Sequence, residues 1–249
     1  MVRAARSLIT HAVTGLSLFG TDEVVLTSQQ ASLRIHLVAL SIFICMLHGS
    51  PTSAHVPYIE GKDYPEGPDF VIRDVDQSKA FYAYLQKDDI DGFEIILDEP
   101  GRIYVSTLIP FCREYAYYDV NFALIGPGLP AAKESLPVTI PAGQGVVVHN
   151  AGFKNWADRP FMYEMFSDRR YFEGRSYTHK TAPAGTYRFI VWHNDGQSGD
   201  YIAIIGRAES FGPSDMKLAF INTPIIQRKE EMHSECEDEG NFAAWFDRD

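Results

Sequence analysis

Histidines are the residues of this sequence that point most directly to a transition-metal site. A segment that reads as a signal peptide ends at Ala54, so cleavage there makes His55 the first residue of the mature chain. A terminal histidine offers its amine and a ring nitrogen to one metal, and imidazole suits copper. His149 and His193 each end a predicted strand and are candidates for the remaining ligand. The pattern gives one hypothesis, a copper-binding redox protein; the other interpretation of His55 is a frayed terminus.

Carboxylates form a second group of candidate metal ligands. Calcium takes six to eight oxygen ligands from flexible loops, and four acids lie close enough in sequence to suggest such a site: Asp74, Asp76, Asp89 and Asp91. Their spacing does not match the EF-hand loop. A calcium site and a set of solvated turn acids therefore stand as the two interpretations.

Aromatic and basic side chains in the middle of the chain are candidates for ligand contact. Flat aromatic rings on one face of a β-sandwich can bind sugar rings, although most aromatic residues of a two-sheet protein belong to its core. The residues selected on this basis are Trp156, Tyr163, Arg169, Arg170 and Trp192. The segment 129–183 that holds most of them carries seven bases and five acids. We expect it to receive an acidic glycan or the acidic tail of the protein itself.

The usual signatures of catalysis are weak in this sequence. No serine lies in a G-x-S-x-G elbow, and Cys112 has no nucleophile signature around it. Glu164 and Asp168 are close in sequence, but a glycosidase pair requires facing carboxylates, which spacing alone does not establish. The sequence favours a non-catalytic protein.

Composition excludes two broad classes. The 249 residues are 45% hydrophobic and 13% aromatic, which is more apolar surface than a disordered chain carries. The net charge of −11 disfavours sequence-independent binding to nucleic acid or anionic lipid, because both require a cationic face.

An export signal is predicted near the N-terminus. Residues 37–47 form eleven residues without a charge, Arg34 precedes them, and small residues lead to Ala54. This core is shorter than the roughly 20 apolar residues that span a bilayer. We therefore expect a secreted or extracellular protein with residues 1–54 removed; the alternative is a membrane anchor formed by residues 35–48. Cleavage leaves Cys112 and Cys236, which form one disulfide or remain separate thiols.

The mature chain predicts an all-β fold. Prolines make residues 55–69 an extended entry segment. Residues 70–210 then alternate apolar and polar side chains between Gly and Pro turns, which favours an antiparallel β-sandwich of the jelly-roll kind. The expected strands are 93–97, 102–109, 121–125, 138–140, 145–149, 161–166, 170–177, 186–193 and 201–205.

Two local expectations concern the end of the sandwich and the tail. The turn signal at 194–196, Asn-Asp-Gly, predicts that the strands on either side of it are hairpin neighbours. Residues 211–249 are expected to form a short helix after Pro213, broken or kinked at Pro224, and then a solvated acidic tail. Deleting residues 230–249 is accordingly expected to cost less than about 1 kcal/mol.

Several segments resemble the bacterial pre-peptidase C-terminal type of domain, a small secreted jelly-roll. They are DQSKAFYAYL at 76–85, DIDGFEI at 89–95, AGTYRFIV at 184–191 and GDYIAI at 199–204. The chain is also similar to uncharacterised exported prokaryotic proteins through AHVP at 54–57, GPGLP at 126–130 and the stretch 199–209. The resemblance implies a sandwich over about residues 70–210, with calcium bound near acidic loops and an accessory role outside catalytic centres.

These observations together favour a secreted or surface-exposed, non-catalytic binding module. Its ligand is expected to be a carbohydrate, a protein or calcium. Copper binding through His55 is the alternative function, and contact with a membrane is expected only through the signal or anchor segment.

Overall fold

The computed structural model describes residues 55–60, 70–153, 156–228, 232–237 and 242. The predicted signal peptide, the anchor alternative and Trp245 lie outside these residues. No helix of the described part is long and apolar enough to cross a membrane.

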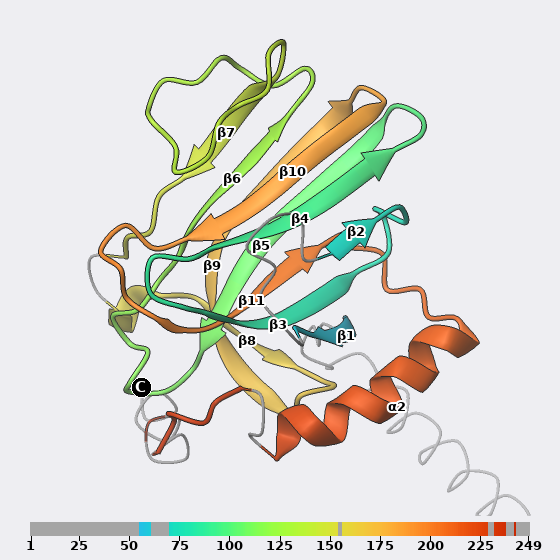
Figure 1. Cartoon of the computed structure of the whole chain (residues 1–249). Helices are drawn as coiled ribbons and strands as arrows, with labels where there is room; N and C mark the ends of the chain where they lie inside the picture. Colours follow the sequence, from blue (N-terminus) through green and yellow to red (C-terminus); the bar gives the residue numbers. More distant parts are fainter. Residues whose placement is uncertain (1–54, 61–69, 154–155, 229–231, 238–241, 243–249) are drawn as a thin grey trace, which may run out of the picture. The chain divides into compact units, whose positions relative to one another are not determined.

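Two β-sheets form the body of the protein (Figure 1). The six-stranded sheet has the order β1 (Val56–Ile59), β3 (Lys79–Leu85), β11 (Gly199–Ile205), β5 (Gly101–Pro110), β9 (Arg169–Ala182) and β8 (Phe161–Glu164). The five-stranded sheet has the order β2 (Phe70–Ile72), β4 (Ile90–Leu97), β10 (Gly185–Trp192), β6 (Asn121–Gly126) and β7 (Gly145–His149). The predicted all-β sandwich with a short C-terminal helix is confirmed.

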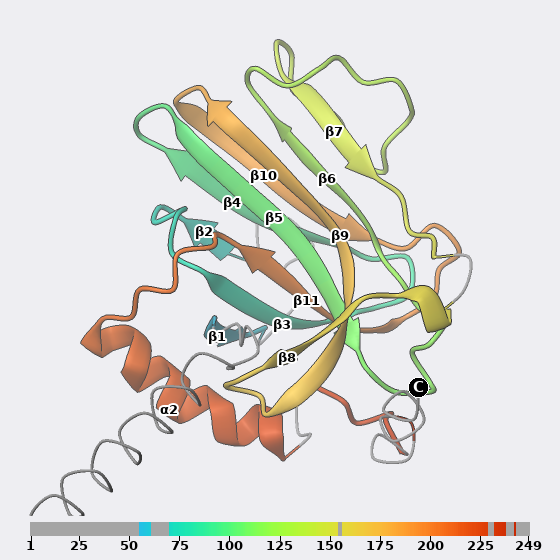
Figure 2. The ribbon, with the colours of Figure 1, turned by 180° about the vertical axis from the view of Figure 1, so that it is seen from behind.

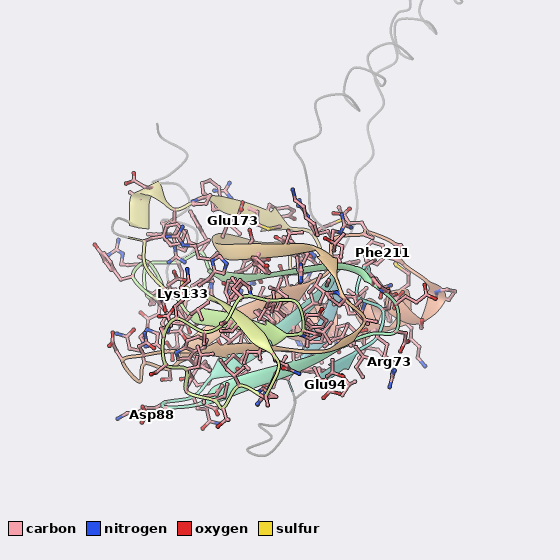
Figure 3. All side chains as sticks on the ribbon, turned by 90° about the horizontal axis from the view of Figure 1, so that it is seen from above. Arg73, Asp88, Glu94, Lys133, Glu173 and Phe211 are labelled. Carbon is pink, nitrogen blue, oxygen red and sulfur yellow. A yellow bond between two sulfur atoms is a disulfide. The ribbon has the colours of Figure 1, made fainter. Side chains whose placement is uncertain are left out.

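Alternating side chains build the core between the sheets. On β10, Tyr187, Phe189 and Val191 share one face and are fully buried, as the two-residue period of a strand requires. Phe189 lies opposite Phe93 of β4, with ring centroids 5.6 Å apart. One cluster joins them to residues of the six-stranded sheet such as Tyr201. Side chains fill the space between the layers in Figure 3.

Most strand pairs are antiparallel, but two edge pairs are parallel. β1 runs parallel to β3, and β2 runs parallel to β4. The chain passes from β1 in one sheet to β2 in the other before it returns to β3. This alternation between sheets lets consecutive strands of one sheet run in the same direction without a crossover helix. The sheets are therefore mixed, whereas the sequence predicted purely antiparallel pairing.

The predicted hairpin around residues 194–196 is wrong. β10 pairs with β4 and β6, while β11 pairs with β3 and β5, so the two strands belong to different sheets. Gly196 has a φ of +60° and turns the chain as expected. The turn carries the chain from one sheet to the other. A turn signal in the sequence predicts a change of chain direction, but it does not determine which strands then form hydrogen bonds with each other.

The predicted strand at 138–140 is also absent. Val138 and Ile140 lie in a loop, where they pack against a small cluster that includes Ile125, Ile190 and Trp192. Their apolar character therefore reflects burial under the loop rather than strand pairing.

The helix α2 (Pro213–Gln227) begins where the sequence predicts it. Pro213 occupies the first turn, and the Asp215 carboxylate accepts the Gly212 N–H at 2.8 Å. The helix continues three residues past Pro224 instead of breaking there. It packs beside β1 (Figures 1 and 2), and the Asn222 amide donates to the Pro57 carbonyl at 2.9 Å.

The prediction of a solvated tail is wrong for part of the tail that the structure describes, whereas Ser234, Glu235 and Glu237 are exposed. Met232, His233, Cys236 and Phe242 are all buried. Cys236 is bonded to Cys112, with an S–S distance of 2.04 Å and a Cα–Cα distance of 5.8 Å. A high density of acids marked the tail as solvated, but its few apolar residues are the ones that pack.

His233 anchors the same segment through polar contacts. Its backbone N–H donates to Asp200 Oδ2 at 2.8 Å, and its Nε2 lies 2.9 Å from the Tyr171 hydroxyl. Burial raises the pKa of Asp200 to about 6. The tail is thus joined to the sandwich by a disulfide, by apolar packing and by hydrogen bonds.

Candidate functional site

A cleft of about 320 Å³ opens at one end of the five-stranded sheet, where β4 begins and β10 and β7 end. Its apolar lining consists of Ile90, Leu136, Pro137, Val148 and Trp192. Its polar lining consists of Asp88, Asp89, Glu134, Ser135, Asn150, His193 and Asn194. Figure 3 shows Asp88 at the edge of the molecule.

Hydrogen bonds hold several polar groups of the cleft in place. The Trp192 indole N–H donates to Asn194 Oδ1 at 2.8 Å, and the Asn150 amide lies 3.4 Å from Glu134 Oε2. Asp89 Oδ1 accepts the N–H of Ile90 at 2.8 Å. The cleft therefore presents carboxylate and amide oxygens, which are acceptors, around an apolar floor.

His193 serves as an anchor of the loop that follows β10. Its Nδ1 accepts the N–H groups of Asp195 at 3.1 Å and Gln197 at 3.4 Å, which places the ring proton on Nε2. The ring stacks on Tyr118 at 5.7 Å. Burial lowers the pKa of His193, so the imidazole is neutral at pH 7.

The acids of the predicted calcium site do not come together. Asp74 and Asp76 precede β3, while Asp89 and Asp91 follow it, and seven strand residues separate the pairs by about 23 Å. Asp76 pairs with Arg102 at 3.6 Å, and buried Asp91 accepts the Tyr201 hydroxyl at 2.6 Å. Within the described ranges, one group of three ligand-type side chains lies close together, Cys112, Glu114 and Cys236, and its two cysteines are bonded to each other.

The histidines of the predicted copper site are also separated. His55 directly precedes β1 and is buried beside the start of β3, where its Nδ1 lies 2.5 Å from Ser78 Oγ. His193 lines the cleft beside Asp89, which follows the end of β3. His149 ends β7 and stacks on Phe122 with centroids 4.8 Å apart. The length of β3 therefore separates His55 from His193.

The burial of His55 makes the stability of the protein depend on pH. Desolvation lowers the pKa of His55 to about 4, so the folded protein keeps it neutral where the unfolded chain binds a proton. Stability from this group is complete above pH 6.5 and falls as the pH drops towards 4, by up to about 3 kcal/mol.

We expect His55→Gln to remove this acid-dependent loss. The measurement is urea denaturation of both proteins at pH 7 and pH 4.5. Asp200, whose pKa is raised, is present in both proteins, so its opposite contribution cancels in the comparison. An unchanged pH dependence in the variant contradicts the neutral, buried His55.

The β8–β9 hairpin brings together three of the predicted ligand residues. Tyr163 pairs in register with Arg170, and Arg169 pairs with Glu164. The Tyr163 hydroxyl donates to Asp168, and Arg169 donates to the Gln227 carbonyl at 3.0 Å.

The other two predicted ligand residues lie elsewhere. Trp156 begins the short helix Trp156–Asp158, and its side chain is outside the described part of the structure. Trp192 belongs to the other sheet and is only 6% exposed, so it forms part of the floor of the cleft rather than an open stacking platform.

Glu164 has a structural role in place of the catalytic one considered from the sequence. It is fully buried, and its carboxylate accepts the Tyr82 hydroxyl at 3.0 Å and the Ser167 N–H at 2.6 Å. This carboxylate therefore holds the β8–β9 turn against the six-stranded sheet.

Sequence reasoning missed Glu134 and Asn150, which face the acids of the β3–β4 turn across the cleft. Their signal was weak, because the loop holding Glu134 has no regular pattern. Asn150 directly follows a predicted strand, and polar residues at strand ends are the feature that could have identified it.

Comparisons with known proteins give matches of fold only. No family model matches the sequence, and the comparison with curated proteins finds no match. The pre-peptidase C-terminal domain of a Bacillus anthracis collagenase aligns with 57% of this chain and 97% of its own, at 15% identity and a TM-score of 0.30. The fold-level resemblance noted from the sequence motifs thus recurs among the solved structures.

Two periplasmic inhibitors of g-type lysozyme are also similar. PliG of Aeromonas hydrophila aligns with 63% of this chain and 99% of its own, at 10% identity and a TM-score of 0.30. PliG of Salmonella Typhimurium aligns with 57% of this chain and 100% of its own, at 14% identity and a TM-score of 0.28. In each case the similarity is one of fold.

Proposed function

We propose that the protein is an exported, non-catalytic binding module and that the cleft beside Trp192 binds a carbohydrate. The observation that carries this proposal is the lining of the cleft. Three carboxylates and two amides surround an apolar floor within about 320 Å³. This volume lies within the range of small-molecule sites, which combine an apolar lining with a few polar groups.

A saccharide fits this lining because its surface is divided in the same way. Its hydroxyl groups donate hydrogen bonds to carboxylates such as Asp88 and Glu134, and bonds to charged groups are the stronger ones. Its C–H faces pack against apolar side chains such as Leu136 and Val148. His193 is occupied by its own loop, which supports binding rather than acid–base chemistry.

Export is supported by the cysteines as well as by the predicted signal peptide. The Cys112–Cys236 bond suits an oxidising compartment, where disulfides form and persist.

Substitutions in the cleft test its role. We expect Asp88→Asn combined with Glu134→Gln to weaken saccharide binding by about tenfold or more, because each change replaces a charged acceptor with a neutral one. Asparagine tolerates the positive φ of 62° at position 88, so the backbone is preserved. Binding is measured by screening oligosaccharides and then by titration, with the fluorescence of Trp192 as the local signal.

Asp98→Asn is the matched control, since Asp98 is an exposed turn acid after β4, at the other end of that strand from the cleft. It is expected to bind like the unaltered protein. Equal affinities for the cleft variant and the unaltered protein would rule out the cleft as the binding site.

A further inference from the structure

The cleft beside Trp192 carries negative charge that the protein does not neutralise by direct contact. Its three carboxylates belong to Asp88, Asp89 and Glu134. Within the residues that the structure describes, none of the three forms an ion pair. The described residues that line the cleft include no lysine and no arginine. The charge of the cleft is therefore available to a ligand.

The backbone and a neighbouring turn fix the position of Asp88. Its φ of 62° lies in the left-handed region, which a residue other than glycine adopts at an energetic cost. Gly196, in the turn between β10 and β11, lies against the carboxylate, since a methyl group at that position would meet Asp88 Oδ1 at 2.6 Å. The close approach of two turns thus places this carboxylate at the cleft.

The spacing of the three carboxylates favours an organic cation over a metal ion. A calcium ion gathers its oxygen ligands around one point, at about 2.3–2.6 Å from the ion. No choice of one oxygen from each of Asp88, Asp89 and Glu134 brings all three within 4.8 Å of one another. The charges are spread around the cleft, so a ligand that reaches them all must be larger than an ion.

The rest of the lining supplies no positive charge of its own. Burial lowers the pKa of His193, and its Nδ1 accepts the N–H groups of Asp195 and Gln197, so the ring is neutral at pH 7. The other polar groups of the lining are one hydroxyl and two amides, from Ser135, Asn150 and Asn194. A cationic group of a ligand therefore meets acids at the cleft without repulsion from the protein.

We propose that the saccharide bound at the cleft carries a protonated amine, as the units of a glucosamine oligomer do. The inference rests on the proposed carbohydrate function of the cleft and names the class of sugar. The sugar ring packs on the apolar floor, and the ammonium group lies among the three carboxylates. An acidic sugar, which the seven bases of segment 129–183 suggested, would bring like charges together here.

Two related oligosaccharides test recognition of the amine. Tetramers of glucosamine and of N-acetylglucosamine share one backbone and differ in the acetyl group, which removes the charge. At pH 6, where the amine is protonated, we expect the glucosamine tetramer to bind the full chain about tenfold more tightly, because hydrogen bonds between charged groups are the stronger ones. Titration calorimetry measures both affinities. Equal affinities would leave a carbohydrate site that does not recognise the amine, and would overturn this inference alone.

Matched double substitutions locate the effect. Asp88→Asn with Glu134→Gln should weaken binding of the glucosamine tetramer more than that of the acetylated one, so that the preference falls to about threefold or less. Asp98→Asn with Glu99→Gln removes the same two charges from the exposed turn after β4 and should leave the preference unchanged. A preference that falls equally in both variants would show general attraction to an acidic protein and would overturn the inference.

A lysine tetrapeptide with blocked ends separates recognition of the sugar from recognition of charge. Its four ammonium groups lie on flexible stems, and it has no sugar ring to pack on the apolar floor. We expect it to bind about tenfold more weakly than the glucosamine tetramer. Equal binding of the peptide would show that the cleft selects cationic side chains of a protein, and would overturn the inference.

The screen of oligosaccharides keeps the two proposals apart. If the cleft binds another saccharide but not the glucosamine tetramer, the carbohydrate function stands and the amine inference is wrong. If no saccharide binds at the cleft, both proposals are wrong.

Discussion

Deleting residues 230–249 is expected to lower the free energy of unfolding by more than about 5 kcal/mol. The deletion removes the Cys112–Cys236 bond, whose partners are 124 residues apart, and closing a loop of that length stabilises by about 5 kcal/mol in the chain-entropy model. It also removes buried Met232 and Phe242, each worth about 2 kcal/mol of apolar burial. The acidic composition of the tail predicted the opposite, a loss below about 1 kcal/mol.

Urea denaturation of the deleted and full chains measures this loss. The chain ending at Phe242 is the control, because it keeps the disulfide and all four buried tail residues and should lose little stability. Reduction of the full chain should reproduce the part of the loss that belongs to the disulfide. A deletion that costs less than about 1 kcal/mol would show that the tail is not part of the folded core.

Replacing Phe172 by alanine is expected to cost about 3–5 kcal/mol, the range for removing a buried phenylalanine ring. Phe172 is fully buried and contacts the rings of Phe111 at 4.6 Å and Phe242 at 6.0 Å. The guanidinium of buried Arg159 lies 4.6 Å from its ring centroid, so the cation loses an aromatic neighbour as well. The ring thus joins β9, the tail and the loop that holds Arg159.

Phe220→Ala is the matched control for this substitution. Phe220 lies on α2 and is 83% exposed, so its loss should change the free energy of unfolding by less than about 0.5 kcal/mol. Thermal or urea unfolding of both variants measures the difference. Similar losses at the two positions would contradict the assignment of Phe172 to the core.

The elements of the sandwich were largely predictable because strand patterning is local. Tyr187, Phe189 and Val191 alternate with more polar residues, and this two-residue period marks a half-buried strand whatever its neighbours are. The same reasoning failed at Val138–Ile140, where apolar residues pack without pairing. It also missed the short edge strands β1 and β2, of four and three residues, and the seven-residue strand β3.

The candidate site was less predictable because it joins segments far apart in sequence. Asp74 and Asp89 are near neighbours along the chain, yet β3 places them at opposite ends of the sandwich. Glu134 and Asn150 lie far from Asp88 in sequence, yet all three line one cleft. Closeness in sequence means closeness in space only where the chain turns back, and an extended strand between two residues carries them apart.

The sequence by itself determined the all-β class, most strand positions and the start of α2. It also contains few signatures of catalysis. The tertiary structure alone decided which strands share a sheet, which ends of strands meet at the cleft and how the tail is held. The reason is physical. Alternation and turn residues act within a few positions, whereas pairing and burial depend on which distant segments exclude water together. Cys236 and Phe242 illustrate this difference, because they lie in an acidic segment and become buried only against Cys112, Phe111 and Phe172.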